Sequence, residues 1–270
     1  MSTRVVATLV AFLLLSSAAA QPARSGAAPA ASAPTGAVYF SPPPESAIPD
    51  TPVGTMIRFG RDVFVDTQRY AKDWVGNGLN CVNCHLDAGR QPNAAPLWAA
   101  YVAYPAFSSR DQRVDTFAGR LQDCFRYSLN GKPPPGDGAV IAGLTAYSWW
   151  LAQGAVVGSQ MAGRGYPEIA DPPQPMSADR GKRVYAARCS ACHGAEGNGQ
   201  KTVERWLFPA LWGRNSYNAG AGMHRPRTAA QFIRAKMPLG QPDSLSVQDA
   251  WDVAAYINAQ PRPPAPKVAR

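Results

Sequence analysis

Two copies of the motif C-x-x-C-H constrain this chain more than any other feature. The first copy, CVNCH, occupies residues 81–85 and the second, CSACH, residues 189–193. This spacing is the signature for covalent attachment of haem c, because two thiols one helical turn apart reach the two vinyl groups of one haem and the next histidine binds its iron. We therefore predict two covalently bound haem c groups, held by Cys81, Cys84, His85, Cys189, Cys192 and His193.

A disulfide and a zinc site are the alternative uses of a C-x-x-C pair. Zinc needs further Cys or His ligands nearby, and the only histidine outside the two motifs is His224. A thioredoxin-like oxidoreductase needs an α/β pattern, and no β-rich alternating run is evident. Haem attachment is therefore the favoured interpretation.

The second motif lies within a helical frame. Residues 177–194 begin with Ser177 or Asp179 as the N-cap, and a later segment begins with Ser246 as the N-cap. These two segments resemble the N- and C-terminal helices of a class I cytochrome c, in which a Met before Pro is the distal haem ligand. Met237 is therefore the predicted distal ligand of the second iron. The later helix presents an apolar face of Val247, Ala250, Trp251, Ala254 and Ile257.

The first half of the chain repeats this order. A helix is predicted before CVNCH, within residues 54–70, and a closing helix within residues 140–155. The predicted fold class is therefore all-α, with two tandem class I cytochrome c-like domains that each hold one haem c. The boundaries that we predict are residues 51–165 for the N-terminal domain, 166–176 for a Pro-rich linker, 177–262 for the C-terminal domain and 263–270 for a tail.

The first residues predict export to the periplasm. Arg4, a short apolar run and the Ala-rich end at residues 18–20 are typical of a cleavable signal peptide, residues 1–20. The run is too short to span a bilayer comfortably, although an uncleaved anchor is the alternative. An Ala/Pro-rich leader follows at residues 21–50, and no other segment is long and apolar enough to span a membrane, so the mature chain is predicted to have no membrane span.

The net charge of +9 is carried by scattered Lys and Arg residues. Because these residues do not run together, nucleic-acid binding has little support. A basic surface on an exported protein favours a small anion or an acidic protein partner, and solubility alone is the alternative.

Cys124 is the fifth cysteine, outside both motifs. It follows His85 at about the distance at which Met237 follows His193, and no His or Met lies between His85 and Cys124. Cys124 is therefore the predicted distal ligand of the first iron. A buried apolar thiol is the alternative for Cys124, and Met161 and His224 are the rival ligands.

The neighbours of Cys124 suggest chemistry with an anion. On an α-helix, Arg120 and Ser128 lie four residues to either side of Cys124 and share its face, and Arg110 lies upstream. Two guanidiniums and a hydroxyl can hold an oxyanion, and the cations also favour a thiolate. Each arginine has two alternatives, a solvated surface position or pairing with a haem propionate.

These segments together resemble the dihaem thiosulfate dehydrogenases that form tetrathionate. The resemblance covers about residues 55–259 and includes GRLQDCFRYSLNG, AYSWWLAQG, PALWGRNSYNAGAGMHR and AKMPLG. It implies a catalytic first haem and a second haem that passes electrons onward, with Met237, or Lys236 beside it, as ligand. The family often has Met after the serine, where this chain has Leu129. The resemblance implies His/Cys ligation by His85 and Cys124, and a substrate site of Arg110, Arg120 and Ser128.

The predicted activity is therefore oxidative coupling of two thiosulfate anions to tetrathionate, with two electrons passed to an external acceptor such as a small redox protein. The same site can in principle run in reverse. One alternative is a non-catalytic dihaem electron carrier in which Cys124 tunes the potential. The other is a Cys-ligated haem subunit of the Sox type, which acts on a carrier protein. For Lys236, a solvated position is the alternative to competition with Met237 for oxidised iron.

Overall fold

The computed structural model describes residues 38–108 and 112–267. The predicted signal peptide, the first part of the predicted leader and Arg110 lie outside these residues. The described residues belong to one compact unit, which contains two hydrophobic clusters. None of the helices in the described ranges has the length and apolar character needed to cross a membrane.

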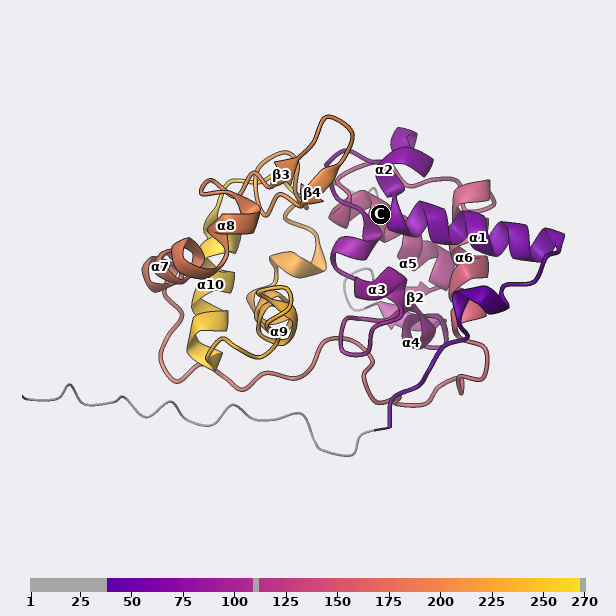
Figure 1. The fold of residues 1–270 in the computed structure, drawn as a ribbon, viewed down its shortest axis with the longest axis horizontal. Coiled ribbons are helices and arrows are strands. Elements are labelled where there is room, and N and C mark those ends of the chain that lie inside the picture. Colours follow the sequence, from indigo (N-terminus) through magenta and orange to yellow (C-terminus); the bar gives the residue numbers. More distant parts are fainter. Residues whose placement is uncertain (1–37, 109–111, 268–270) are drawn as a thin grey trace, which may run out of the picture. The chain divides into compact units, whose positions relative to one another are not determined.

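The first half is built around the packing of α1 (Pro52–Val65) against α6 (Ala139–Leu151), which cross each other (Figure 1). Thr51 caps α1 by accepting a hydrogen bond from Gly54 N. The other elements of this half are η1 (Glu45–Ala47), α2 (Thr67–Tyr70), η2 (Lys72–Trp74), η3 (Cys81–Asn83), α3 (Leu86–Gly89), α4 (Leu97–Tyr101), β1 (Ala106–Ser108), β2 (Arg113–Asp115), α5 (Phe117–Asp123) and the π-helical η4 (Cys124–Ser128).

The second half is built around α7 (Ala178–Arg188) and α10 (Val247–Ala259), with α9 (Pro226–Lys236) packed on α10 (Figure 1). Ser177 and Ser246 cap the first two helices as the sequence predicts, accepting hydrogen bonds from Arg180 N and Asp249 N. The remaining elements are α8 (Ser190–His193), β3 (Gln200–Lys201), β4 (Trp206–Phe208) and η5 (Gly222–His224).

Glycine allows the main helices to approach closely in both halves. A Cβ at Gly60 of α1 would lie 1.8 Å from the carbonyl oxygen of Gly143 in α6. A Cβ at Gly181 of α7 would lie 1.9 Å from the carbonyl oxygen of Asp252 in α10. Both distances are far below van der Waals contact, so each crossing requires a residue without a side chain.

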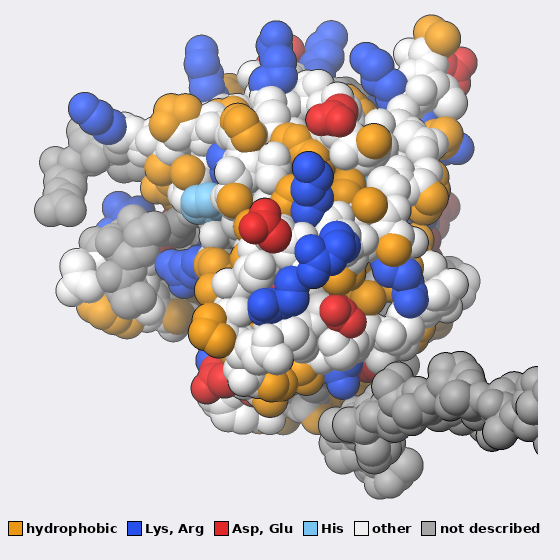
Figure 2. Space-filling view, turned by 90° about the vertical axis from the view of Figure 1, so that its left-hand side faces the viewer, with side chains coloured by type: hydrophobic (Ala, Val, Ile, Leu, Met, Phe, Trp, Pro, Cys, Tyr) orange, Lys and Arg blue, Asp and Glu red, His pale blue; other side chains and the backbone are white. Residues whose placement is uncertain are grey.

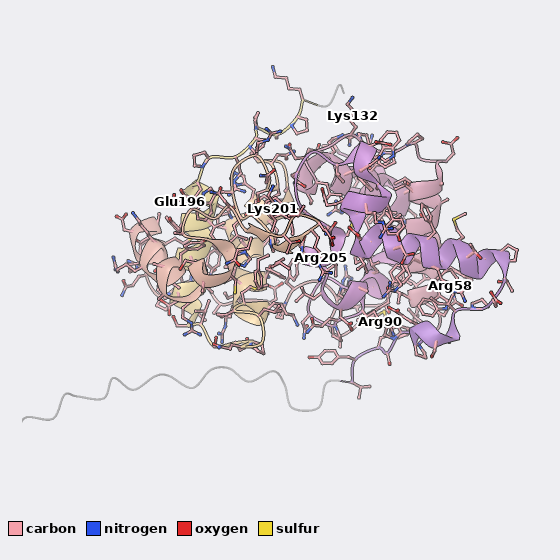
Figure 3. All side chains as sticks on the ribbon, turned by 45° about the horizontal axis from the view of Figure 1, so that its top comes forward. Arg58, Arg90, Lys132, Glu196, Lys201 and Arg205 are labelled. Atoms are coloured by element: carbon pink, nitrogen blue, oxygen red, sulfur yellow. The ribbon has the colours of Figure 1, made fainter. Side chains whose placement is uncertain are left out.

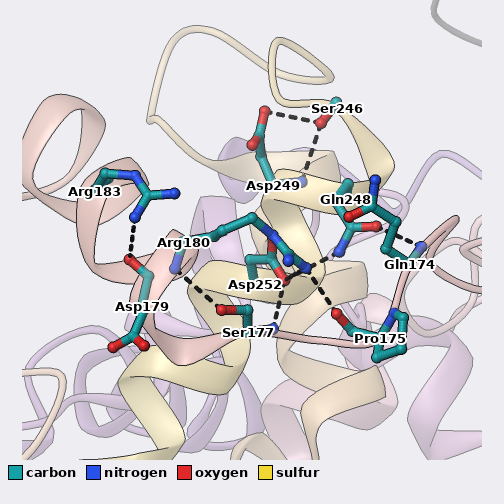
Figure 4. Close-up of polar contacts among 10 residues, drawn as sticks. All are labelled: Gln174, Pro175, Ser177, Asp179, Arg180, Arg183, Ser246, Gln248, Asp249 and Asp252. Carbon is teal, nitrogen blue, oxygen red and sulfur yellow. Dashed lines mark hydrogen bonds and ion pairs between the residues drawn. The ribbon is translucent and has the colours of Figure 1, made fainter.

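A buried carboxylate fixes the contact between α7 and α10 (Figure 4). Asp252 is 1% exposed and accepts hydrogen bonds from Arg180 Nε at 2.6 Å and Ser177 N at 2.7 Å. Gln248 adds a further donor at 3.0 Å. Burial alone would raise the pKa of Asp252, but these hydrogen bonds outweigh burial and lower it.

In the described residues, two small antiparallel hairpins are the exception to the predicted all-α fold. β1 pairs with β2, and β3 pairs with β4. Each strand has only two or three residues, which is too short for a period-two pattern to be recognised in the sequence. The chain is therefore helical with two small sheets.

Arginines tie the first described segment to the bundle, and Figure 3 labels two of them. Arg58 of α1 donates to the carbonyl oxygens of Ile48 and Pro49. Arg90 donates to the carbonyl oxygens of Pro42 and Pro43. The segment before α1 is therefore held against the first half by side chain to backbone hydrogen bonds.

Candidate haem sites and an adjoining polar cavity

The first C-x-x-C-H motif opens onto a cavity of about 370 Å³. Cys81, Cys84 and His85 all line it. His85 Nδ1 donates to the carbonyl oxygen of Ala95 at 2.6 Å, which leaves Nε2 as the nitrogen with a free lone pair. Burial lowers the pKa of His85 and therefore favours the neutral imidazole that binds a metal.

The residues around this cavity fit a haem c. The two thiols and the imidazole come from one short segment, and the wall is otherwise largely apolar. All five cysteines are free, so neither C-x-x-C pair forms a disulfide. Within the described ranges, no group of three or more Cys, His, Asp or Glu is placed to hold a metal ion. The apolar part of the wall includes Phe64, Leu79, Leu97, Phe117, Leu121, Phe125 and Leu144.

Cys124 lies at the point where the helix changes type. The α-helical hydrogen bonds of α5 end at Asp123, and Leu129 N then donates to the carbonyl oxygen of Cys124 at 2.9 Å, a π-helical bond. The helix expected around Cys124 is therefore α-helical from Phe117 to Asp123 and π-helical from Cys124 to Ser128. Even so, Arg120, Cys124 and Ser128 all line the haem cavity, because a π turn also returns to nearly the same face after four residues.

Neither rival ligand is placed like Cys124. Met161 packs against the first hydrophobic cluster, and His224 lies in η5. Among the described residues that line the cavity, neither of the two occurs. Ligation of the first iron by Cys124 therefore stays a prediction that the geometry favours.

Arg120 is a cation beside a thiol. Among the described residues, no hydrogen bond or ion pair engages its guanidinium. The charge of Cys124 is the largest cause that raises the pKa of Arg120, and burial opposes it. Arg120 is therefore available to an anion, which is the predicted role, or to a haem propionate, which is one of the two predicted alternatives.

A second cavity, of about 250 Å³, adjoins the first. Tyr104, Arg120 and Ser128 line both cavities. The remaining lining is mostly polar or small and includes Asp115 and, from the second half of the chain, Gly220 and Arg225. The predicted anion-binding residues that the structure describes therefore lie between an apolar cavity and a polar one.

The carbonyl groups of η4 are bonded to distant segments. Asn218 Nδ2 donates to Arg126 O at 2.9 Å, and Asn218 N donates to Tyr127 O at 3.2 Å. Asn77 Nδ2 donates to Ser128 O at 2.8 Å. Asn218 is fully buried. These bonds satisfy the carbonyls at the end of the helix, and they fix the segment that carries Cys124. Neither asparagine is predicted as a functional residue from the sequence.

The second C-x-x-C-H motif also fits a haem c. His193 Nδ1 donates to the carbonyl oxygen of Pro209 at 2.9 Å, so this histidine is oriented in the same way as His85. Burial lowers the pKa of His193. Met237 packs against the second hydrophobic cluster, to which Cys189 also contributes, while Cys192 is exposed.

Lys236 is half-buried rather than fully solvated. Its Nζ donates to the carbonyl oxygen of Pro92 at 3.0 Å, in the first half of the chain. Burial lowers the pKa of Lys236. In this structure Lys236 therefore bonds to the backbone of the other half, and ligation of the second iron by Met237 or Lys236 stays a prediction.

Comparisons with known proteins identify relatives of this chain. Residues 177–257 match the model of the family "Cytochrome C oxidase, cbb3-type, subunit III". The chain is 50% identical to a thiosulfate dehydrogenase of Stutzerimonas stutzeri over 86% of this chain and 76% of that protein. It is 52% identical to a thiosulfate dehydrogenase of Thiomonas intermedia over 84% of this chain and 73% of that protein.

A solved structure is similar over most of the described chain. The thiosulfate dehydrogenase of Marichromatium purpuratum in its as-isolated form superposes with a TM-score of 0.82 and is 47% identical. The match covers 85% of this chain and 51% of that chain. The present chain therefore spans about half the length of that solved protein.

Proposed function

Since the chain belongs to the thiosulfate dehydrogenase family and is an oxidoreductase with a cytochrome c fold, we propose that it joins two thiosulfate anions into tetrathionate and releases two electrons. The cavity of the first C-x-x-C-H motif carries this proposal, because a thiol, a guanidinium and a hydroxyl meet there in Cys124, Arg120 and Ser128. Haem attachment requires none of the three, and together they suit an anionic sulfur substrate.

In this proposal the chain has two tandem class I cytochrome c-like domains, each with one haem c. Residues 51–165 form the catalytic domain and residues 177–262 the electron-transfer domain. The two similarly oriented histidines support this division, and so do the two hydrophobic clusters, except that Tyr217 and Ala221 of the second domain pack into the first cluster. When bound, each haem supplies a one-electron acceptor, so that two haems match the two electrons of the reaction.

The reaction balances without protons: two S₂O₃²⁻ form S₄O₆²⁻ and two electrons, with one new S–S bond. Two dianions repel each other, and a cation between them reduces that repulsion. The position of Arg120 in the lining of both cavities supports this role for it, and the family resemblance assigns the same role to Arg110, which lies outside the described residues. Ser128 donates a hydrogen bond to an oxyanion oxygen.

Cys124 carries the sulfur during turnover in this proposal. Its thiolate and one thiosulfate form Cys–S–S–SO₃⁻ and lose two electrons, and attack by the second thiosulfate then releases tetrathionate and restores the thiolate. Intact-mass analysis of the protein, rapidly quenched after thiosulfate addition, should show the adduct. Its absence at every quench time would overturn this step.

Electrons leave through the second domain. Cys192 is exposed, and Lys182, Arg183 and Arg188 of α7 are exposed in the same part of the chain. Lys and Arg side chains are spread over the face that carries α7 and α8 (Figure 2). This face suits an acidic redox protein as acceptor, in the periplasm if the signal peptide acts as predicted.

Steady-state reduction of ferricyanide by thiosulfate tests the proposal. The protein should turn over with thiosulfate alone, and Cys124→Gly should keep both haems and lose turnover. Full activity of the variant would show a site elsewhere. Turnover only with a sulfur carrier protein would show a Sox-type subunit, and no turnover with either would show an electron carrier. Protein-film voltammetry with thiosulfate and tetrathionate then gives the preferred direction.

A further inference from the structure

The polar cavity beside the haem cavity has two cationic walls. Arg120 comes from α5 and Arg225 from the residue before α9, in the other half of the chain. Arg225 is exposed, and within the described ranges no hydrogen bond or ion pair holds its guanidinium. The Arg225 backbone is fixed, because its N–H donates to Gly222 O at 3.0 Å. The cavity therefore lies between two guanidiniums that are free to bind an anion.

Among the described residues that line the polar cavity, one is acidic, Asp115, and it does not cancel the positive charge of Arg120 and Arg225. Asp115 is 6% exposed and accepts a hydrogen bond from Arg113 Nε at 2.9 Å. Arg113 itself is not one of the described residues that line the polar cavity. Hydroxyl groups of Tyr104 and Ser128 add neutral donors to the lining. The cavity is therefore positive and rich in donors, which suits an oxyanion.

The proposed reaction needs a place for a second dianion. One thiosulfate binds beside Cys124 in the haem cavity. The second thiosulfate must approach the first although the two dianions repel each other. The polar cavity shares Arg120 and Ser128 with the haem cavity, so an anion in it lies next to the first.

We propose that the polar cavity is the binding site of the second thiosulfate and that Arg225, supplied by the C-terminal half, binds its sulfonate oxygens. This inference rests on the proposed function and adds a second anion site to it. Arg120 then lies between the two anions, and Arg225 holds the outer one. The substrate site is assembled from both halves of the chain.

Equilibrium dialysis with ³⁵S-thiosulfate tests the stoichiometry in the Cys124→Ser background, where turnover is blocked. This dihaem protein should bind two thiosulfates per chain, and addition of Arg225→Gln should leave one. The matched control is Arg214→Gln, which removes the same charge from an exposed position in the same segment. Arg214 is not one of the described residues that line the polar cavity. The control should bind two.

Steady-state kinetics supply a second readout in the chain with Cys124 intact. Arg225→Gln should lower kcat/KM for thiosulfate about tenfold or more, the effect of one lost charge-assisted hydrogen bond, with the haem spectrum unchanged. Arg214→Gln should stay within about twofold. Two sites retained by Arg225→Gln, or kinetics equal to those of the control, would overturn the second site. Absence of thiosulfate turnover in the unaltered protein would instead overturn the proposed function.

Discussion

Replacement of Asn218 by alanine should loosen the turn that carries Cys124. The side chain makes three hydrogen bonds: Nδ2 donates to Arg126 O at 2.9 Å and to Asn130 Oδ1 at 3.1 Å, and Oδ1 accepts from Gly220 N at 2.9 Å. Asn218 is fully buried, so water does not replace these bonds. Each buried group left unpaired costs about 1–3 kcal/mol, and we expect a total loss of about 3 kcal/mol in the free energy of unfolding.

Equilibrium unfolding in guanidinium chloride, followed by circular dichroism, measures this loss. Asn215→Ala is the matched control, because Asn215 lies in the same segment and is exposed. Among the described residues, its only hydrogen bond is accepted by its backbone carbonyl from Gly78 N. The control should change the free energy by less than about 0.5 kcal/mol.

Low-spin ferric EPR separates this effect from general destabilisation. If Asn218 positions the Cys124 turn, the thiolate-type signal of the first haem should broaden or split in Asn218→Ala under conditions where the chain stays folded. The signal of the second haem should not change. A stability equal to that of Asn215→Ala, together with an unaltered thiolate signal, would refute the reasoning.

Three further predictions concern other parts of the molecule. Arg120→Ala should raise the KM for thiosulfate and slow turnover with the haem spectrum nearly unchanged, whereas a shifted spectrum and potential with the same substrate dependence would identify a propionate partner. Lys236→Ala should strengthen the Met-to-ferric-iron band near roughly 695 nm if Lys236 competes with Met237, and an equally strong band in both proteins would exclude Lys236 as a ligand. Because the pKa of Asp252 is lower in the folded than in the unfolded chain, its stabilisation is present above about pH 4 and is lost as the pH falls further. Arg180→Ala should lower the melting temperature at pH 7 and weaken this acid dependence, and an unchanged pH profile would contradict the role given to the pair.

The local features of the chain were predictable from the sequence. Ser177 and Ser246 cap their helices through bonds to residues three positions away, so the pattern that predicts them lies within one turn. The C-x-x-C-H motif is likewise local, because its two cysteines and its histidine lie within five consecutive residues. The absence of His and Met between His85 and Cys124 directed attention to Cys124, which lines the same cavity as His85.

The features that depend on distant contacts were not predictable. The π turn at Cys124 is held by Asn77 and Asn218, and the latter lies in the other half of the chain. No periodicity encodes that pairing, so the sequence suggested an ordinary α-helix there. Arg225 was missed for the same reason, because it reaches the polar cavity only after the two halves have packed together.

The balance of the reaction tests the central claim most directly. Thiosulfate consumed, tetrathionate formed and ferricyanide reduced would be measured together for the purified dihaem protein and for Cys124→Gly with both haems attached. The account predicts one tetrathionate and two electrons for every two thiosulfates, and no turnover in the variant. A different sulfur product, or equal turnover by Cys124→Gly, would contradict it.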